Sequence, residues 1–300
     1  MGGVNAIELL GLTKKFGSLT AVEDLNLSVK PGEVMGFLGP NGAGKTTAMR
    51  ILIGLLAPTS GTAKILGYDV RDRSKEMLAR VGYLPGVLEL YEHLTGKEFL
   101  HFVSRIRGKN CDKQIKSLSN RLDIDLKVHI HDLSRGNRQK IGVVAAFMHN
   151  PEVLILDEPT SGLDPLVQRE FEGILDEATA QGAAVLLSSH FLSEVELLSN
   201  RIAIIHKGKL LLVDEMDNLR NKALRRVEFS FDKQIDSSAF KALPSVTKVV
   251  EIDHRVLLEV MGSETELLRL AANLGASSVR TEETNLDEIF VGLIDNGGAK

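Results

Sequence analysis

Short runs of apolar residues alternate with amphipathic segments over the first two thirds of the chain. The run VMGFL, within residues 33–38, has the length of a strand and is followed by Gly39. After a glycine-rich stretch, residues 46–56 have apolar positions at helical spacing, and Pro58 and Gly61 then end the segment. This pattern predicts a strand, a loop and a helix, in that order.

The same alternation returns in the middle of the chain. It predicts strands at 153–156, 183–188 and 201–205, and helices at 165–180 and 192–198. Continuous apolar strands that alternate with helices are typical of parallel sheets covered on both faces. We therefore expect an α/β core with a mainly parallel sheet.

Two segments depart from this alternation. Between about residues 86 and 150 the strand-like runs disappear, and helices are predicted at 98–107, 113–122 and 138–148, which indicates a helical subdomain inserted into the core. After residue 214, strands are predicted at 227–231, 246–252, 256–260 and 277–281, with helices at 238–243 and 264–274. This β-α-β-β-α-β order is that of a ferredoxin-like unit, and a last helix is predicted at 286–293. We expect domains at 1–218 and 219–300.

Composition limits the class of protein. The 300 residues are 43% hydrophobic, which is enough for a sizeable core and two domains. Lys and Arg number 36 against 40 Asp and Glu, for a net charge of −4, whereas nucleic-acid binders usually have a strong basic excess. Cys111 is the only cysteine, so a reducing compartment is expected. We expect no nucleic-acid partner.

Neither a secretory signal nor a membrane span is expected. The N-terminus lacks a basic start followed by an apolar segment. The longest apolar stretches, such as 141–148, are far shorter than the ~18 residues that a spanning helix needs. We expect a soluble chain, so any membrane-spanning part would come from another polypeptide.

Residues 39–46 fit the phosphate-binding pattern G-x-x-x-x-G-K-[ST], between a predicted strand and a predicted helix. Glycines in such a loop let backbone N–H groups converge on phosphate oxygens, and the helix N-terminus favours anions. The Lys45 ammonium is expected to contact the β- and γ-phosphates, and the Thr46 hydroxyl to bind Mg²⁺. The residues predicted to bind the nucleotide here are Gly39, Pro40, Asn41, Gly42, Ala43, Gly44, Lys45, Thr46 and Thr47.

Two further segments carry candidate chemistry. The strand at 153–156 leads into Asp157 and Glu158, and carboxylates at the carboxyl end of such a strand can face the phosphate site. Asp157 is then expected to hold Mg²⁺ and Glu158 to orient the attacking water, although a solvated acidic loop would give the same pattern. Ser134 and Gly136 begin a predicted helix, which is either a second anion-binding site or an ordinary capped helix.

Four motifs together resemble the ATP-binding cassette of ABC transporters. They are the loop at 39–46, LSRGN at 133–137, LDEPTSGLDP at 156–165 and SSH ending at His190, in this order. The resemblance covers roughly residues 5–215. It implies a P-loop NTPase fold with an inserted helical subdomain, and the binding and hydrolysis of ATP with Mg²⁺.

The resemblance also implies roles for single residues. Phe16 matches an aromatic residue that stacks on adenine, and stacking tolerates Phe because the ring face makes the contact. Asp164 matches a residue expected to meet the partner subunit near its phosphate loop. His190 matches a histidine expected to contact the γ-phosphate and to hold Glu158 and the water in place.

Pairing of two chains follows from the same resemblance. The LSRGN segment is expected to complete the site of the opposite subunit, where Ser134, Gly136 and Asn137 would contact ATP bound to the partner subunit's Lys45. Because this chain has one cassette, it needs a second copy or a homologous ATPase chain. ATP would hold the pair together, and hydrolysis would release it.

Two positions depart from the family pattern. LSRGN stands where LSGGQ is commonest, although Ser134 and Gly136 remain. Gly86, aligned through the LY at 90–91 and the LT at 94–95, stands where the family usually has Gln, whose side chain reaches Mg²⁺ and the attacking water. We hypothesise that water fills the gap and that Gly86 weakens coupling to the membrane partner.

LSRGNRQK at 133–140 and a small terminal domain ending in TNLDEIFVGL at 284–293 resemble ATPases of ABC-2-type exporters, including drug, lipid and polysaccharide exporters. This implies a peripheral ATPase subunit on the cytoplasmic face of the cell membrane, bound to an integral-membrane permease. The terminal domain would be a dimerisation or regulatory module, or would only cap the cassette. The alternative is a soluble ABC ATPase acting in translation or DNA repair, but those relatives typically have two cassettes or a long coiled-coil insertion. A kinase would leave LSRGN unexplained.

Overall fold

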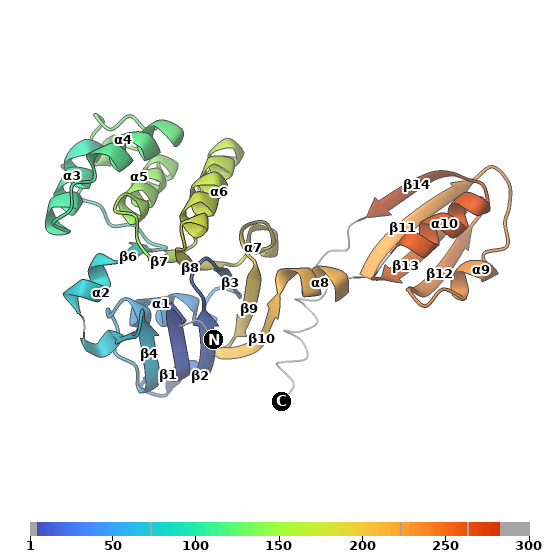
Figure 1. Cartoon of the computed structure of the whole chain (residues 1–300), viewed down its shortest axis with the longest axis horizontal. Helices are drawn as coiled ribbons and strands as arrows, with labels where there is room; N and C mark the ends of the chain where they lie inside the picture. Colours follow the sequence, from blue (N-terminus) through green and yellow to red (C-terminus); the bar gives the residue numbers. More distant parts are fainter. Residues whose placement is uncertain (1–4, 73, 223, 263, 283–300) are drawn as a thin grey trace. The chain divides into compact units, whose positions relative to one another are not determined.

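The structure, a computed structural model, describes residues 5–72, 74–222, 224–262 and 264–282 (Figure 1). The chain divides into two compact units, Met1–Val213 and Asp214–Lys300. The domain boundary predicted at residue 218 lies within helix α8, Met216–Lys222.

Six strands form the central sheet of the first unit. They are β3 (Val34–Leu38), β6 (Val81–Leu84), β7 (Val153–Asp157), β8 (Ala184–Ser189), β9 (Arg201–His206) and β10 (Lys209–Glu215), in the order β10-β9-β3-β8-β7-β6. The strands from β9 to β6 pair in parallel. Because β3, β7 and β8 are buried along their whole length, they read as continuous apolar runs in the sequence. The predicted parallel α/β core is confirmed.

A second sheet in the first unit is antiparallel and was not predicted. It contains β1 (Ile7–Phe16), β2 (Leu19–Val29), β4 (Ser60–Ile65) and β5 (Tyr68–Asp69), in the order β2-β1-β4-β5. The pairing of β1 with β2 shifts register between Leu9 and Leu12 and again at Lys14. Since each bulge interrupts the alternation of buried and exposed positions, the sequence of β1 lacks the period-2 pattern that would have indicated a strand.

Helix α1 (Lys45–Leu52) packs into the core that the two sheets share. Its residues Met49, Ile51 and Leu52 are fully buried, in one apolar cluster with residues of β1, β2, β3, β7 and β8. The helix ends at Leu52 rather than at residue 56, because Gly54 adopts a left-handed conformation with φ of 75°. This helix carries the last residues of the phosphate-binding pattern.

Helices make up most of the chain between β6 and β7. They are α3 (Gly96–Ile106), α4 (Asp112–Arg121) and α5 (Arg135–Phe147), and both α3 and α4 pack against α5. Figure 1 shows them grouped with α6 (Pro165–Ala180), while α7 (Leu192–Leu198) follows β8 and α2 (Lys75–Ala79) precedes β6. Short 3₁₀ turns lie at Val70–Asp72 and Ile130–Asp132. The helices predicted in this part of the chain are all present.

The second unit contains, after α8, the strands β11 (Leu224–Phe231), β12 (Val246–Ile252), β13 (Arg255–Met261) and β14 (Ala276–Glu282), with helices α9 (Ser238–Lys241) and α10 (Thr265–Asn273). Its sheet is antiparallel, in the order β12-β13-β11-β14. Phe229 packs on Phe240 of α9, and Leu267 of α10 lies in the same core. The predicted ferredoxin-like order is confirmed, while the helix predicted at 286–293 lies outside the described residues.

Candidate functional site

The glycine-rich loop between β3 and α1 depends on glycine at two positions. A Cβ atom at Gly39 would lie 2.3 Å from the backbone oxygen of Ile205, in β9. Gly44 has φ of 110°, and a Cβ there would lie 2.4 Å from the backbone oxygen of Ala21, in β2. Any other residue at either position would push the loop away from these strands. Glycine therefore fixes the loop against both sheets of the unit.

Lys45 is the first residue of α1 and is buried, with 6% of its surface exposed. Its Nζ donates to the backbone oxygens of Gly39 and Pro40, at the start of the loop, and lies 3.9 Å from Oε1 of Glu158. Burial lowers the pKa of Lys45, against the weaker opposite effect of Glu158 and Asp157. An anion bound at the loop would favour the ammonium form, so this position suits a phosphate group.

Asp157 ends β7 with 2% of its surface exposed, and hydroxyl groups hold both of its carboxylate oxygens. Thr46 Oγ1 donates to Oδ2 over 2.7 Å, and Ser188 Oγ donates to Oδ1 over 2.5 Å. A hydroxyl beside a buried carboxylate provides the hard oxygen ligands that Mg²⁺ prefers. Among the described residues no group of three or more His, Cys, Asp or Glu could hold a metal ion. The site therefore fits Mg²⁺ only if water and substrate supply further ligands, which is the usual way this ion binds.

Glu158 follows directly and adopts a left-handed backbone conformation with φ of 53°, which is uncommon outside glycine. Its backbone N–H donates to the backbone oxygen and to Oγ of Ser188, each over 3.2 Å. On the side chain, Oε2 lies 2.8 Å from Nδ1 of His190. The structure thus brings the two predicted catalytic side chains into contact, although they are 32 positions apart in the chain.

Lys45, Thr46, Asp157 and Glu158 line one cavity of about 440 Å³, whereas His190 does not line it. It is lined by Phe16, Leu19, Ala21, residues 40–47, Arg50, Gly86, Val87, Asp157 and Glu158. Phe16, at the end of β1, is 47% exposed, and Lys14 Nζ lies 4.9 Å from the centroid of its ring. A ring at the edge of a phosphate-binding cavity can stack on a nucleotide base.

Gly86 also lies at this cavity, beside Asp157. A Cβ atom at Gly86 would be 3.1 Å from Oδ2 of Asp157. A longer side chain at this position would therefore have to pass close to the proposed Mg²⁺ ligand.

Six predicted site residues do not line the cavity: Gly39 begins the loop, His190 contacts Glu158, and the other four are Ser134, Gly136, Asn137 and Asp164. Ser134 caps α5 and accepts a hydrogen bond from the backbone N–H of Asn137 over 3.2 Å. Gly136 packs against the loop between β7 and α6, since a Cβ there would lie 2.6 Å from the backbone oxygen of Gly162. Asp164 caps α6 by accepting from two backbone N–H groups, over 3.0 and 3.1 Å.

The motifs did not indicate several residues around the site. Arg50 could have been found by spacing, because it lies one helical turn beyond Thr46 on α1. Lys14 lies two residues before Phe16 on β1, a spacing that places both side chains on one face of a strand. Ser188 reaches Asp157 from β8, and no spacing rule connects it with the site.

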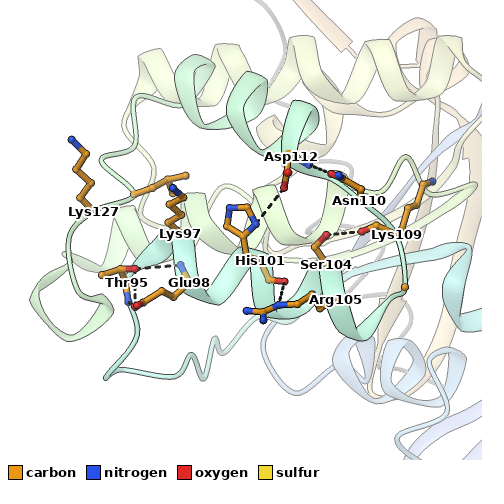
Figure 2. Close-up of a pocket in the computed structure, with 12 residues that line it drawn as sticks. Thr95, Lys97, Glu98, His101, Ser104, Arg105, Lys109, Asn110, Asp112 and Lys127 are labelled. Atoms are coloured by element: carbon orange, nitrogen blue, oxygen red, sulfur yellow. Dashed lines mark hydrogen bonds and ion pairs between the residues drawn. The ribbon is translucent and has the colours of Figure 1, made fainter.

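A larger hollow, of about 940 Å³, lies among the helices between Thr95 and Lys127 (Figure 2). Several of its polar groups pair with one another: His101 Nδ1 lies 3.3 Å from Oδ1 of Asp112, and Ser104 Oγ donates to the backbone oxygen of Lys109 over 2.6 Å. None of the predicted site residues lines it, so volume alone does not identify the functional site.

Comparisons with known proteins show which family the chain resembles. The family model described as ABC transporter matches residues 22–161. The chain is 35% identical to the bacitracin transport ATP-binding protein BcrA of Bacillus licheniformis, over 97% of this chain and 98% of that protein. A solved structure of the ATP-binding subunit of an ABC transporter is 30% identical, with a TM-score of 0.68, and the match covers 72% of this chain and 92% of that one.

A second solved structure, the dimeric structure of a bacterial ABC transporter cassette, shares the fold. It is 22% identical, with a TM-score of 0.64, over 70% of this chain and 98% of that one. Among the described residues, no helix has the length and apolar character needed to cross a membrane.

Proposed function

The chain belongs to the family of ABC transporter ATP-binding proteins, which energise membrane transporters by hydrolysing ATP, and from this premise we propose that two copies share each ATP molecule between them. One observation carries the proposal. The cavity of a single chain contains Phe16, Lys45 and Glu158, but Ser134 and Asn137 lie outside it. The nucleotide contacts predicted for Ser134 and Asn137 would then be made to ATP bound in another chain.

In the proposed complex, the triphosphate lies on the N–H groups of residues 40–46 and on the Lys45 ammonium. Adenine stacks on one face of the Phe16 ring, and the Lys14 ammonium lies over the opposite face. Thr46 and Asp157 would hold Mg²⁺, which when bound supplies positive charge to the phosphate oxygens.

Hydrolysis is assigned to Glu158 and His190. The Glu158 carboxylate accepts a hydrogen bond from the attacking water and orients it in line with the bond between the γ-phosphorus and the leaving oxygen. His190, 2.8 Å from Glu158, keeps the carboxylate in this orientation and donates to the γ-phosphate. Glu158 reaches the cavity because its left-handed backbone turns the chain at the end of β7.

The second copy supplies the start of α5. Ser134 caps this helix as an acceptor, so its hydroxyl hydrogen remains available to a phosphate oxygen, and the helix N-terminus favours the negative charge. Gly136, Asn137 and Asp164 would contact the same nucleotide or its loop. In a symmetric pair, each copy gives and receives the same contacts, which makes two equivalent sites. The dimeric cassette with the same fold supports this arrangement.

The membrane partner is proposed to bind the surface beside the cavity. Val87, directly after Gly86, is 72% exposed, and Tyr91 packs edge-on against Phe102 at 5.5 Å, with both rings reaching the surface. Exposed apolar groups that cluster in this way are typical of protein-protein contacts. The chain would then lie on the cytoplasmic face of the membrane, and its likeness to a bacitracin transport protein favours export by an ABC-2-type system. The terminal unit is proposed to be a dimerisation or regulatory module.

ATPase measurement with the cognate permease tests this proposal. We expect Mg-ATP turnover in the wild type and its loss in Glu158→Gln, which keeps the shape but removes the carboxylate. Glu76→Gln, an exposed change on α2, is the matched control and should turn over like the wild type. Full turnover by the Glu158 variant would contradict the assigned chemistry. Failure of the chain to co-purify with the permease would favour the soluble alternative.

A further inference from the structure

A carboxylate outside the predicted site joins the two segments that carry the proposed catalytic pair. Glu194 lies in the first turn of α7. Its Oε1 accepts from Thr160 Oγ1 over 2.8 Å, and its Oε2 accepts from Ser189 Oγ over 2.5 Å. Both hydroxyl-bearing residues are buried, at 5% and 0% exposure, so solvent competes little for these bonds.

The two residues that donate these hydrogen bonds are close in the sequence to the proposed catalytic pair. Thr160 is the second residue after Glu158, and Ser189 directly precedes His190. The side chains of Glu158 and His190 touch at 2.8 Å. One carboxylate therefore spans the two loops whose side chains must meet for the proposed chemistry.

Other contacts hold the start of the first loop, and Arg135 donates to Ser161 Oγ further along it over 2.9 Å. Ser188 binds the backbone N–H of Glu158, and Gln139 Nε2 donates to the backbone oxygens of Glu158 and Pro159, over 3.2 and 3.0 Å. Beyond Pro159, the Thr160 hydroxyl ties the turn to the end of β8 through Glu194. Since the left-handed backbone of Glu158 sets the direction of its side chain, a shift of this turn would move the carboxylate away from His190.

We propose that Glu194 is a positioning residue that keeps the side chains of Glu158 and His190 in contact for hydrolysis. The inference rests on the proposed function of that pair. Glu194 does not line the nucleotide cavity, so it acts through the two hydroxyls and not on the substrate. Displacement of catalytic groups by about 1 Å can lower rates on the order of a hundredfold.

The test separates nucleotide binding from turnover. We expect Glu194→Ala to lower kcat by roughly tenfold to a hundredfold, on the scale of such displacements. The dissociation constant for Mg-ATP should stay at the wild-type value, because the phosphate loop is unchanged. Glu194→Gln keeps one acceptor oxygen and should retain an intermediate kcat. Glu76→Ala, a matched loss of an exposed glutamate in the first turn of α2 that also accepts from a serine hydroxyl, should leave kcat unchanged.

A double-mutant cycle tests whether the effect passes through Thr160. Thr160→Val removes the hydroxyl and should lower kcat by a smaller factor. Combined with Glu194→Ala, it should cause no further loss, since the bond is already absent. Additive losses would overturn the inference, as would an unchanged kcat in Glu194→Ala or a weakened affinity for Mg-ATP that accounts for the whole effect. If Glu194→Ala does not fold, Thr160→Val and Ser189→Ala decide by the same criteria.

Different results would reject this inference and the proposed function. Turnover by Glu158→Gln would reject the proposed chemistry, whatever Glu194 does. An active wild type and an inactive Glu158→Gln, with wild-type turnover in Glu194→Ala, would reject the positioning role alone.

Discussion

Gly86 stands where the resemblance to the family implies Gln, and we expect Gly86→Ala to lower turnover and Gly86→Gln to raise it. An alanine there adds only a Cβ atom, 3.1 Å from Oδ2 and 3.2 Å from Cγ of Asp157. The Asp157 side chain cannot easily move away from such a Cβ atom, because the Thr46 and Ser188 hydroxyls donate to its two carboxylate oxygens over 2.7 and 2.5 Å. A glutamine adds the same Cβ atom together with an amide that can reach the attacking water.

The cost of the added Cβ atom and the gain from the added amide can be compared as free energies. Inserting a group into a closely packed site costs about 1–3 kcal/mol. At the lower end, about 1 kcal/mol lost in the transition state lowers kcat roughly fivefold, which is our expectation for Gly86→Ala. A hydrogen bond that involves a charged group contributes about 1.5–3 kcal/mol. Gly86→Gln should therefore exceed the alanine variant by roughly tenfold or more, and the wild type by about twofold or more.

Phosphate release at saturating Mg-ATP measures this order, with and without the permease. The expected ranking of kcat is Ala, then wild type, then Gln, and stimulation by the permease should rise in the Gln variant. Equal rates for the Ala and Gln variants would show that the amide contributes nothing, and the reasoning about Gly86 would be wrong. Equal rates for all three chains would mean that glycine is merely tolerated here.

Two other predictions concern binding and stability. Phe16→Ala should weaken ATP binding by roughly fivefold to a hundredfold, since base stacking contributes about 1–3 kcal/mol, while Phe16→Tyr should bind as the wild type does in equilibrium titrations with a fluorescent nucleotide. Burial, followed by the charge of Arg107, lowers the pKa of His149 from 6.5 to about 4, so between these pH values the unfolded chain binds a proton that the folded chain does not. The free energy of unfolding should then fall by up to about 3 kcal/mol as the pH drops from 6.5 to 4, and urea titrations should show a smaller fall in His149→Gln; an equal fall in both would contradict this.

Local signals made part of the fold predictable. The predicted bounds of α6 and α7 agree with the structure, and Asp164 with Pro165 at the start of α6 is a strong helix-start signal. The parallel strands were visible as apolar runs because both of their faces are covered. By contrast, α5 begins three residues before the predicted start, because its first turn after Ser134 is polar and carries no apolar periodicity.

Part of the candidate site was likewise predictable from the sequence, and part of it was not. Residues 39–46 lie within one short segment, so their spacing alone indicated a phosphate loop. The contacts of Asp157 with Ser188 and of Thr160 with Glu194 join residues 31 and 34 positions apart, and they form only because β7 and β8 are neighbours in the sheet. The roles proposed for Ser134, Gly136 and Asp164 depend on a second chain, which neither one sequence nor one folded chain contains.

Sedimentation of the Glu158→Gln chain tests the sharing of ATP most directly, since this variant should bind the nucleotide without cleaving it. The account predicts dimers in saturating Mg-ATP that return to the nucleotide-free state of association in Mg-ADP, and loss of the ATP-dependent dimers when Ser134→Arg is added. A Glu158→Gln chain that stays monomeric in saturating Mg-ATP, both alone and with its permease, would contradict the account.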